Sequence, residues 1–141
     1  MTYEAANQDY LNGFAAGWAA FDPTWDQKKR IEWPYSKKFN APAAPWLKVI
    51  FGDVDGFNDA VGVLDTQVAL FTVDIYVPIA TESPTLLRRL ADEVRGVIRK
   101  ISTPTNARPG NLSWRSFGKT TRGEAHGRVG LELEYTLSDV T

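Results

Sequence analysis

Residues Thr66–Pro78 read TQVALFTVDIYVP, in which apolar side chains recur at every second position. From Ala69 onward one face of this segment is apolar and consists of Ala69, Phe71, Val73, Ile75 and Val77. Such an alternation, rich in β-branched and aromatic residues, is typical of a half-buried strand. Pro78 ends the strand because proline cannot donate a hydrogen bond to a central ladder. The sequence therefore predicts a β-sheet built around this strand.

Two helices are expected to cover the apolar face of that sheet. Residues 83–101 begin with a serine and a proline, which suit a helix cap and first turn, and their apolar residues recur at helical spacing. Residues 3–21 carry a second apolar stripe. Gly13 and Gly17 on this helix have the GxxxG spacing of a close packing contact, which we expect to be with the sheet.

Four further segments are predicted to be strands, namely 31–33, 46–53, 112–117 and 129–137. Residues 52–62 are expected to form an acidic loop and residues 102–111 a polar one. The last two strands form a protruding C-terminal β-hairpin, whose glycine-rich tip at 118–127 holds His126 in solvent. The predicted fold class is α+β, in a single domain of residues 1–141. Its mixed, largely antiparallel sheet packs against the N-terminal helix and the long central helix.

The composition excludes several kinds of chemistry. The chain has no cysteine and a single histidine, so thiolate chemistry and a histidine-rich metal site are not expected. No nucleophile, base and orienting group share a recognisable motif, and no glycine-rich nucleotide motif is complete. We therefore expect no catalytic residue, no cofactor, no metal and no enzymatic activity. Without a long apolar run or a signal peptide, the chain is expected to be soluble and made in a cytoplasm.

The acidic loop offers one candidate for metal binding. Asp53, Asp55 and Asp59 follow a DxDGxxD pattern, and carboxylates at such spacing can supply the hard oxygen ligands of calcium. The glycine comes too early for an EF-hand, however, and the closing glutamate is absent. We favour a mobile acidic loop between paired strands, and binding of a cation remains the alternative.

Charge is segregated along the chain although the net charge is only −1. Residues 51–84 contain six acids and no base, and residues 85–123 contain nine bases against two acids. This segregation suits copies that meet head to tail, acidic edge against basic edge. The alternative is two solvated faces that also pair within the monomer. The candidate interface or lumen residues are Asp53, Asp55, Asp59, Arg88, Arg89, Arg95, Arg99, Arg115, Lys119 and Arg122.

The segment from Ile31 to Ser102 resembles the tail terminator family of long-tailed bacteriophages. An aromatic and proline-rich stretch leads into a Trp-Leu-x-Val strand, an apolar strand ends in proline, and a helix with a Leu-Ala-Asp pattern follows. The matching positions are Trp33, Phe39, Pro42, Trp46, Leu47, Val49, Val73, Ile75, Val77, Pro78, Leu90, Ala91 and Asp92. One departure is that Ile79–Ser83 replaces the usual glycine-rich stretch after the proline, which bears on the linker and not on the core.

The resemblance implies a structural virion protein. Subunits of that family assemble, typically as a hexamer, into a ring on the last ring of the tail tube, halt its polymerisation and offer the surface that joins the head. The implied partners are other copies of the chain, the tail tube protein and the head–tail connector protein. DNA would pass through the lumen without specific binding, and no membrane is involved. The protein would belong to the virion tail and be assembled in the host cytoplasm.

Two other functions remain open from the sequence. One is another head–tail connector, head-completion or minor tail protein with a similar small α+β fold. The other is a nucleic-acid-binding module that uses the arginines of residues 88–122, which would require a concentrated basic face and strongly salt-dependent binding.

Overall fold

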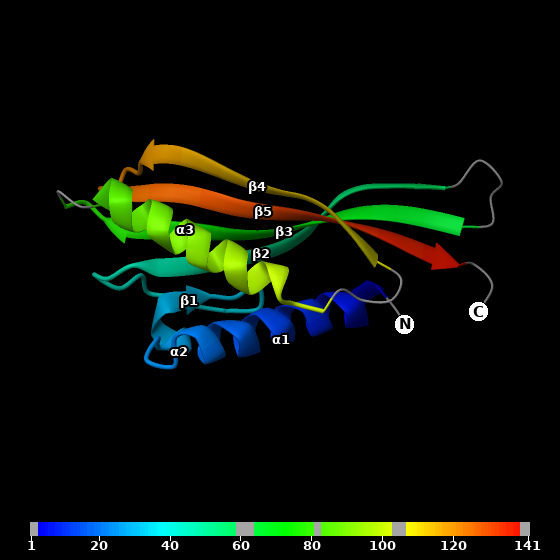
Figure 1. Ribbon diagram of the computed structural model, residues 1–141, viewed down its shortest axis with the longest axis horizontal. Coiled ribbons are helices and arrows are strands. Elements are labelled where there is room, and N and C mark those ends of the chain that lie inside the picture. Colours follow the sequence, from blue (N-terminus) through cyan, green and yellow to red (C-terminus); the bar gives the residue numbers. More distant parts are fainter. Residues whose placement is uncertain (1–2, 59–63, 81–82, 103–106, 139–141) are drawn as a thin grey trace.

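The computed structural model describes residues 3–58, 64–80, 83–102 and 107–138, and the side chains within 8–52, 68–80, 83–102 and 108–134. The helices are α1 (Tyr3–Phe21), α2 (Gln27–Arg30) and α3 (Ser83–Arg99). The strands are β1 (Ile31–Glu32), β2 (Trp46–Asn58), β3 (Leu64–Pro78), β4 (Ala107–Lys119) and β5 (Glu124–Ser138). The predicted α+β class is confirmed (Figure 1).

One mixed sheet holds all five strands in the order β1-β2-β3-β5-β4. Only β1 and β2 run parallel, and every other pair is antiparallel. β3, the strand expected at the centre, does occupy the middle of the sheet. Its apolar residues point toward the helices and are fully buried, Ala69, Phe71, Val73 and Ile75 all being 0% exposed. Burial of each large side chain contributes about 1.5–3 kcal/mol.

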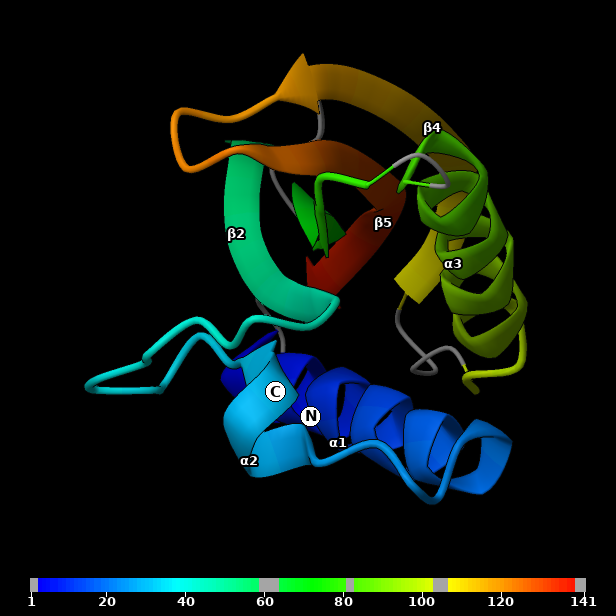
Figure 2. The same ribbon diagram turned by 90° about the vertical axis from the view of Figure 1, so that its left-hand side faces the viewer.

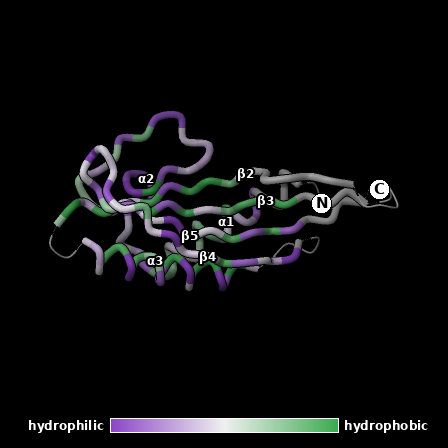
Figure 3. Tube along the Cα trace, turned by 90° about the horizontal axis from the view of Figure 1, so that it is seen from above, coloured by the Kyte–Doolittle hydropathy of each residue, from purple (hydrophilic) through white to green (hydrophobic). Residues whose placement is uncertain are grey.

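Helices α1 and α3 cover the same face of the curved sheet (Figure 2). α1 contributes Phe14 and Trp18 to the core, and the Phe14 ring lies 5.7 Å from that of Phe71 on β3. α3 is strongly amphipathic, and hydrophobic and hydrophilic residues alternate along its trace (Figure 3). Its buried residues include Leu87, Leu90, Ala91, Val94, Val97 and Ile98.

The two glycines of α1 mark its contact with the end of α3. A Cβ atom at Gly13 would lie 2.9 Å from Ile101 Cγ2, and one at Gly17 would lie 3.0 Å from Val97 Cγ1. Both separations are below ordinary van der Waals contact, so a larger residue would push the helices apart. The GxxxG spacing therefore marks a close contact, as expected, but the expectation that it faces the sheet was wrong.

Two predicted loops are partly strand. β2 continues to Asn58, where a loop was expected from residue 52, because residues 53–58 pair with β3 across a register shift between Asp53 and Asp55. β4 begins at Ala107 within the predicted loop 102–111. Pro109 is tolerated there because β4 is an edge strand and its register shifts between Pro109 and Leu112.

The C-terminal hairpin is present, and it is joined to the sheet because β5 pairs with β3 from Glu124 to Ser138. Its tip is shorter than the predicted 118–127, since β4 runs to Lys119 and β5 starts at Glu124. Gly118 and Gly123 adopt positive φ angles of 80° and 82°, which glycine accommodates without a Cβ clash. The tip contacts the end of β3, where the Ile79 N–H donates to the Gly123 carbonyl oxygen at 3.2 Å.

Candidate interaction surfaces

The acidic candidates lie along one edge of the sheet. β1 pairs only with Leu47 and Lys48, so β2 is the outermost strand from Val49 onward. Asp53 and Asp55 belong to this length of β2, which β1 does not pair with, and Asp59 lies outside the described residues. Asp53 and Asp55 are therefore residues of an edge strand, which ends at Asn58, and not residues of a loop. Among the described residues, no group of three or more histidines and acids is placed to hold a metal ion.

The arginines of α3 lie on its solvent side. Arg88, Arg89 and Arg99 are exposed, and Arg95 is half-buried. Arg89 Nε lies 3.8 Å from Glu93 Oε1, and Arg95 Nη1 lies 4.0 Å from Asp92 Oδ1. Burial raises the pKa of Glu93, an effect that Arg89 opposes. Two of the four arginines are therefore partly compensated by acids of their own helix.

The remaining basic candidates lie on the β4–β5 hairpin. Arg115 is exposed on β4, with its guanidinium carbon 5.4 Å from the centre of the Phe117 ring. Lys119 ends β4, and Arg122 in the turn lies 3.8 Å from the carboxylate of Glu124. Arg88 and Lys119 come together at a groove of about 350 Å³ between α3 and β4, which Trp114 and Leu87 also line. This groove thus brings two of the predicted bases together.

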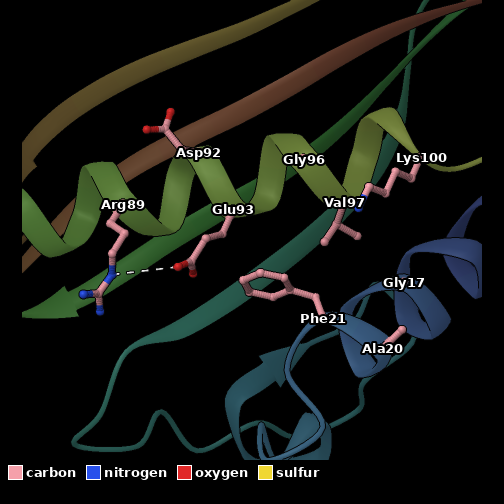
Figure 4. Close-up of a pocket in the computed structure, with 9 residues that line it drawn as sticks. All are labelled: Gly17, Ala20, Phe21, Arg89, Asp92, Glu93, Gly96, Val97 and Lys100. Carbon is pink, nitrogen blue, oxygen red and sulfur yellow. Dashed lines mark ion pairs between the residues drawn. The ribbon is translucent and has the colours of Figure 1, made fainter.

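A second, larger groove of about 520 Å³ separates α1 from α3 (Figure 4). The ring of Phe21 projects from the end of α1 toward α3, and its residue is 49% exposed. Gly17 and Val97 form the floor where the helices are close. The Arg89–Glu93 ion pair lies along the α3 side of this groove.

Sequence reasoning missed the opposite face of the sheet, which neither α1 nor α3 covers and which we call the helix-free face. Aromatic rings cross it in a continuous line, the aromatic row, made of Phe39, Trp46, Tyr76, His126 and Phe117. Successive ring centres lie 5.1, 4.2, 4.4 and 4.9 Å apart. The Trp46 Nε1–H donates to Glu124 Oε2 at 2.7 Å, which pairs a buried indole with a buried carboxylate.

His126 belongs to this row and does not lie in a solvated tip, so the prediction for it was wrong. Its side chain is 17% exposed and stacks between Tyr76 and Phe117, with interplanar angles of 5° and 24°. His126 Nε2 is buried 3.5 Å from Asp74 Oδ2 and makes no hydrogen bond with the described residues. The register of β5 with β3 places the Cα of His126 opposite that of Tyr76. The imidazole therefore stacks on the Tyr76 ring, which shields it from water.

A charged row runs beside the aromatic row. Strand register places its five members side by side across all five strands, in the order Glu32, Lys48, Asp74, Arg128 and Arg115. Lys48 Nζ lies 3.8 Å from Glu32 Oε1, and Arg128 donates to both carboxylate oxygens of Asp74 at 2.6 and 3.1 Å. The hydrogen bond that Arg128 donates to Asp74 raises the pKa of Arg128, and burial together with the charge of Asp74 raises the pKa of Tyr76.

Asp74 also bears on the alternative that the acidic and basic segments pair within one monomer. It is the one acid of residues 51–84 whose side chain the structure describes; it pairs with Arg128, and His126 Nε2 lies 3.5 Å from it. Both partners lie outside the basic segment 85–123. Asp74 therefore does not join the two segments.

No protein-family model matches this chain, and no curated protein matches it in sequence. None of the helices in the described parts of the chain is long and apolar enough to cross a membrane.

Proposed function

We propose that this protein is a ring-forming subunit of the phage tail terminator type, which caps the tail tube, stops its polymerisation and offers a surface to the head. The observation that carries the proposal is the opposite charge of the two edges of the sheet. β4 carries Arg108, Arg115 and Lys119 and no acid. β1 and β2 together carry the acids Glu32, Asp53 and Asp55 and the single base Lys48.

Opposite edges of opposite charge favour contact between different surfaces of identical subunits. Such a heterologous contact closes into a ring when the rotation between neighbours divides a full turn, and otherwise gives an open filament. Complementary charge also speeds encounter and disfavours the reversed, like-on-like arrangement. The resemblance to tail terminators supplies the further expectation of a hexamer bound to the tail tube protein and to a head–tail connector protein. DNA would pass through its lumen without specific binding.

Light scattering of the purified protein, across protein concentration and at low and high salt, tests the proposal. We expect a closed oligomer near six subunits at low salt that dissociates in high salt, because the screening length falls from about 10 Å at 0.1 M to about 3 Å at 1 M. Electron micrographs should show rings at low salt. A strict monomer at every concentration and salt would contradict self-assembly of the ring.

A matched pair of variants locates the charge effect. Asp53→Asn with Asp55→Asn removes two acids from the β2 edge, and should leave folding intact while weakening the oligomer. Asp9→Asn with Asp92→Asn removes two exposed acids from the helices and serves as the control for net charge. Equal weakening by both variants would show that net charge, and not the β2 edge, governs assembly.

A further inference from the structure

The charged row has a paired residue at one end, Glu32, and a residue without a described ion-pair partner at the other, Arg115. Four of its members form two pairs within the subunit, Glu32 with Lys48 and Asp74 with Arg128. The fifth, Arg115, is exposed at the β4 edge, and no described carboxylate lies within ion-pair distance of it. Its neighbour on the sheet is Arg128, another cation. Charges along the row therefore alternate from the β1 edge until the last position, which repeats the sign of the one before.

At the other end of the row lies Glu32, on the outermost strand β1. Its side chain is 29% exposed, and its only described cationic partner is Lys48 at 3.8 Å. A carboxylate can accept from more than one cation, since its two oxygens offer about four lone-pair sites. The acid that Arg115 lacks is thus available on the opposite edge of the same row.

We propose that Arg115 of one copy pairs with Glu32 of the next copy, so that the charged row continues from subunit to subunit. This inference rests on the proposed ring and names the residues of its interface. The occupant of the β4 edge is a second copy of this chain, and the argument for it is charge complementarity at matching positions of one row.

The same alignment produces a second match of opposite charge. Register places Asp55, Val68, Glu134 and Arg108 in one row from β2 to β4. Continuing the sheet in step brings Arg108 into the same row as Asp55 of the neighbouring copy, one strand position away because β1 does not reach this row. The alignment therefore places a second base and a second acid of the two edges in one row.

Side chains, rather than a long backbone ladder, would form this contact. β4 shifts register between Pro109 and Leu112 and again between Ser116 and Gly118. Such irregularities limit continuous hydrogen bonding by an edge strand. The regular length of β4 lies between the two shifts, and Arg115 belongs to it.

The absence of natural cysteine allows a direct test by disulfide formation between Glu32→Cys and Arg115→Cys. Within one subunit the two positions are separated by four strand spacings, about 19 Å, which is too far for a disulfide because the Cα atoms must lie within about 7 Å. On mild oxidation the double variant should therefore form covalent oligomers larger than a dimer. Each single variant can form dimers only, and mixing the two should give mixed dimers.

Glu32→Cys with Arg108→Cys is the matched control, because it uses the same two strands at positions that the proposed alignment keeps apart. Covalent oligomers from the Arg115 pair and not from the control support the inference. Oligomers in light scattering of the wild type, with neither this cross-link nor a loss of assembly in Arg115→Glu, would overturn the Arg115–Glu32 pairing and leave the ring proposal standing. Cross-linked open chains without closed rings would support the pairing and contradict the ring.

Single variants cover the case in which the double variant does not fold. Arg115→Glu places an acid opposite Glu32 and should raise the protein concentration needed for assembly. Lys100→Glu, an equal charge change at an exposed site just after α3 that is not among the candidate interface residues, is its control. Assembly unchanged by Arg115→Glu would contradict the pairing.

Discussion

Arg128 on β5 and Asp74 on β3 face each other across the middle of the sheet, joined by hydrogen bonds of 2.6 and 3.1 Å. Asp74 is 3% exposed although no helix covers this face. Its burial comes from the neighbouring rows of side chains, which shield the carboxylate from water. The pair thus adds a buried, hydrogen-bonded ion pair to the register of β3 and β5, whose apolar residues face the helices on the other side of the sheet.

Replacement of Asp74 by asparagine tests that role. Asp74→Asn keeps the shape of the side chain but removes the charge that Arg128 needs, so we expect a loss of about 1–3 kcal/mol in the free energy of unfolding. Urea unfolding measures it. Glu134→Gln breaks the exposed Arg108–Glu134 pair and should cost at most about 1 kcal/mol. Equal losses for the two variants would show that burial of Asp74 does not increase the contribution of its ion pair to the free energy of unfolding.

The Trp46–Glu124 hydrogen bond gives a second prediction. Glu124→Ala leaves the buried indole N–H without its acceptor and should destabilise the protein by about 1–3 kcal/mol. Glu124→Gln retains an acceptor oxygen and should cost clearly less. Thermal unfolding followed by tryptophan fluorescence compares the two. A glutamine variant as unstable as the alanine variant would mean that the charge of Glu124, and not its acceptor oxygen, is required.

Gly127 is expected to tolerate no side chain, because a Cβ atom there would clash with the indole ring of Trp114. Gly127→Ala should therefore cost about 1–3 kcal/mol, as overpacking usually does. The control is Gly52→Ala, since no atom lies within 4 Å of its added Cβ. Combining Gly127→Ala with Trp114→Leu should recover part of the loss. Full stability of Gly127→Ala alone would show that the indole moves aside freely.

The sequence predicted those parts of the fold that depend on local periodicity. The alternation of Thr66–Pro78 and the helical spacing of residues 83–101 each specify one buried face, and both elements formed as expected. Prediction from the sequence was wrong where pairing between strands distant in the chain determines the local structure. Gly52, Asp53 and Asp55 favour turns by composition, yet pairing with β3 holds them in β2, because tertiary context overrides strand propensity.

The helix-free face escaped prediction for the same reason. Tyr76 and His126 stand 50 positions apart, and only the register of β3 with β5 stacks their rings. The polar side of the strand Thr66–Pro78 was visible as Asp74 and Tyr76, but nothing in the sequence indicated which residues would lie opposite them. The assignment of the candidate bases to an interface or lumen stays a prediction, and the order of the charged row required the structure.

Tyr76 supplies a prediction about alkaline pH. Burial, followed by the charge of Asp74, raises its pKa above the usual value of 10.0. The folded protein therefore holds the phenol proton more tightly than the unfolded chain does. The resulting stabilisation is fully present below pH 10 and is lost as the pH rises through the higher pKa of the folded state. Wild-type stability should accordingly fall above pH 10.

Tyr76→Phe removes the titrating group and keeps most of the ring stacking with Trp46 and His126. Its loss of stability above pH 10 should be smaller than that of the wild type, measured by urea unfolding at a series of pH values. Tyr35→Phe is the control, because Tyr35 is 66% exposed. In a spectroscopic titration of tyrosinate, the wild type should show a late-titrating group that Tyr76→Phe lacks. A titration in which Tyr76→Phe removes an early-titrating group instead would contradict the shielding of Tyr76 by the aromatic row.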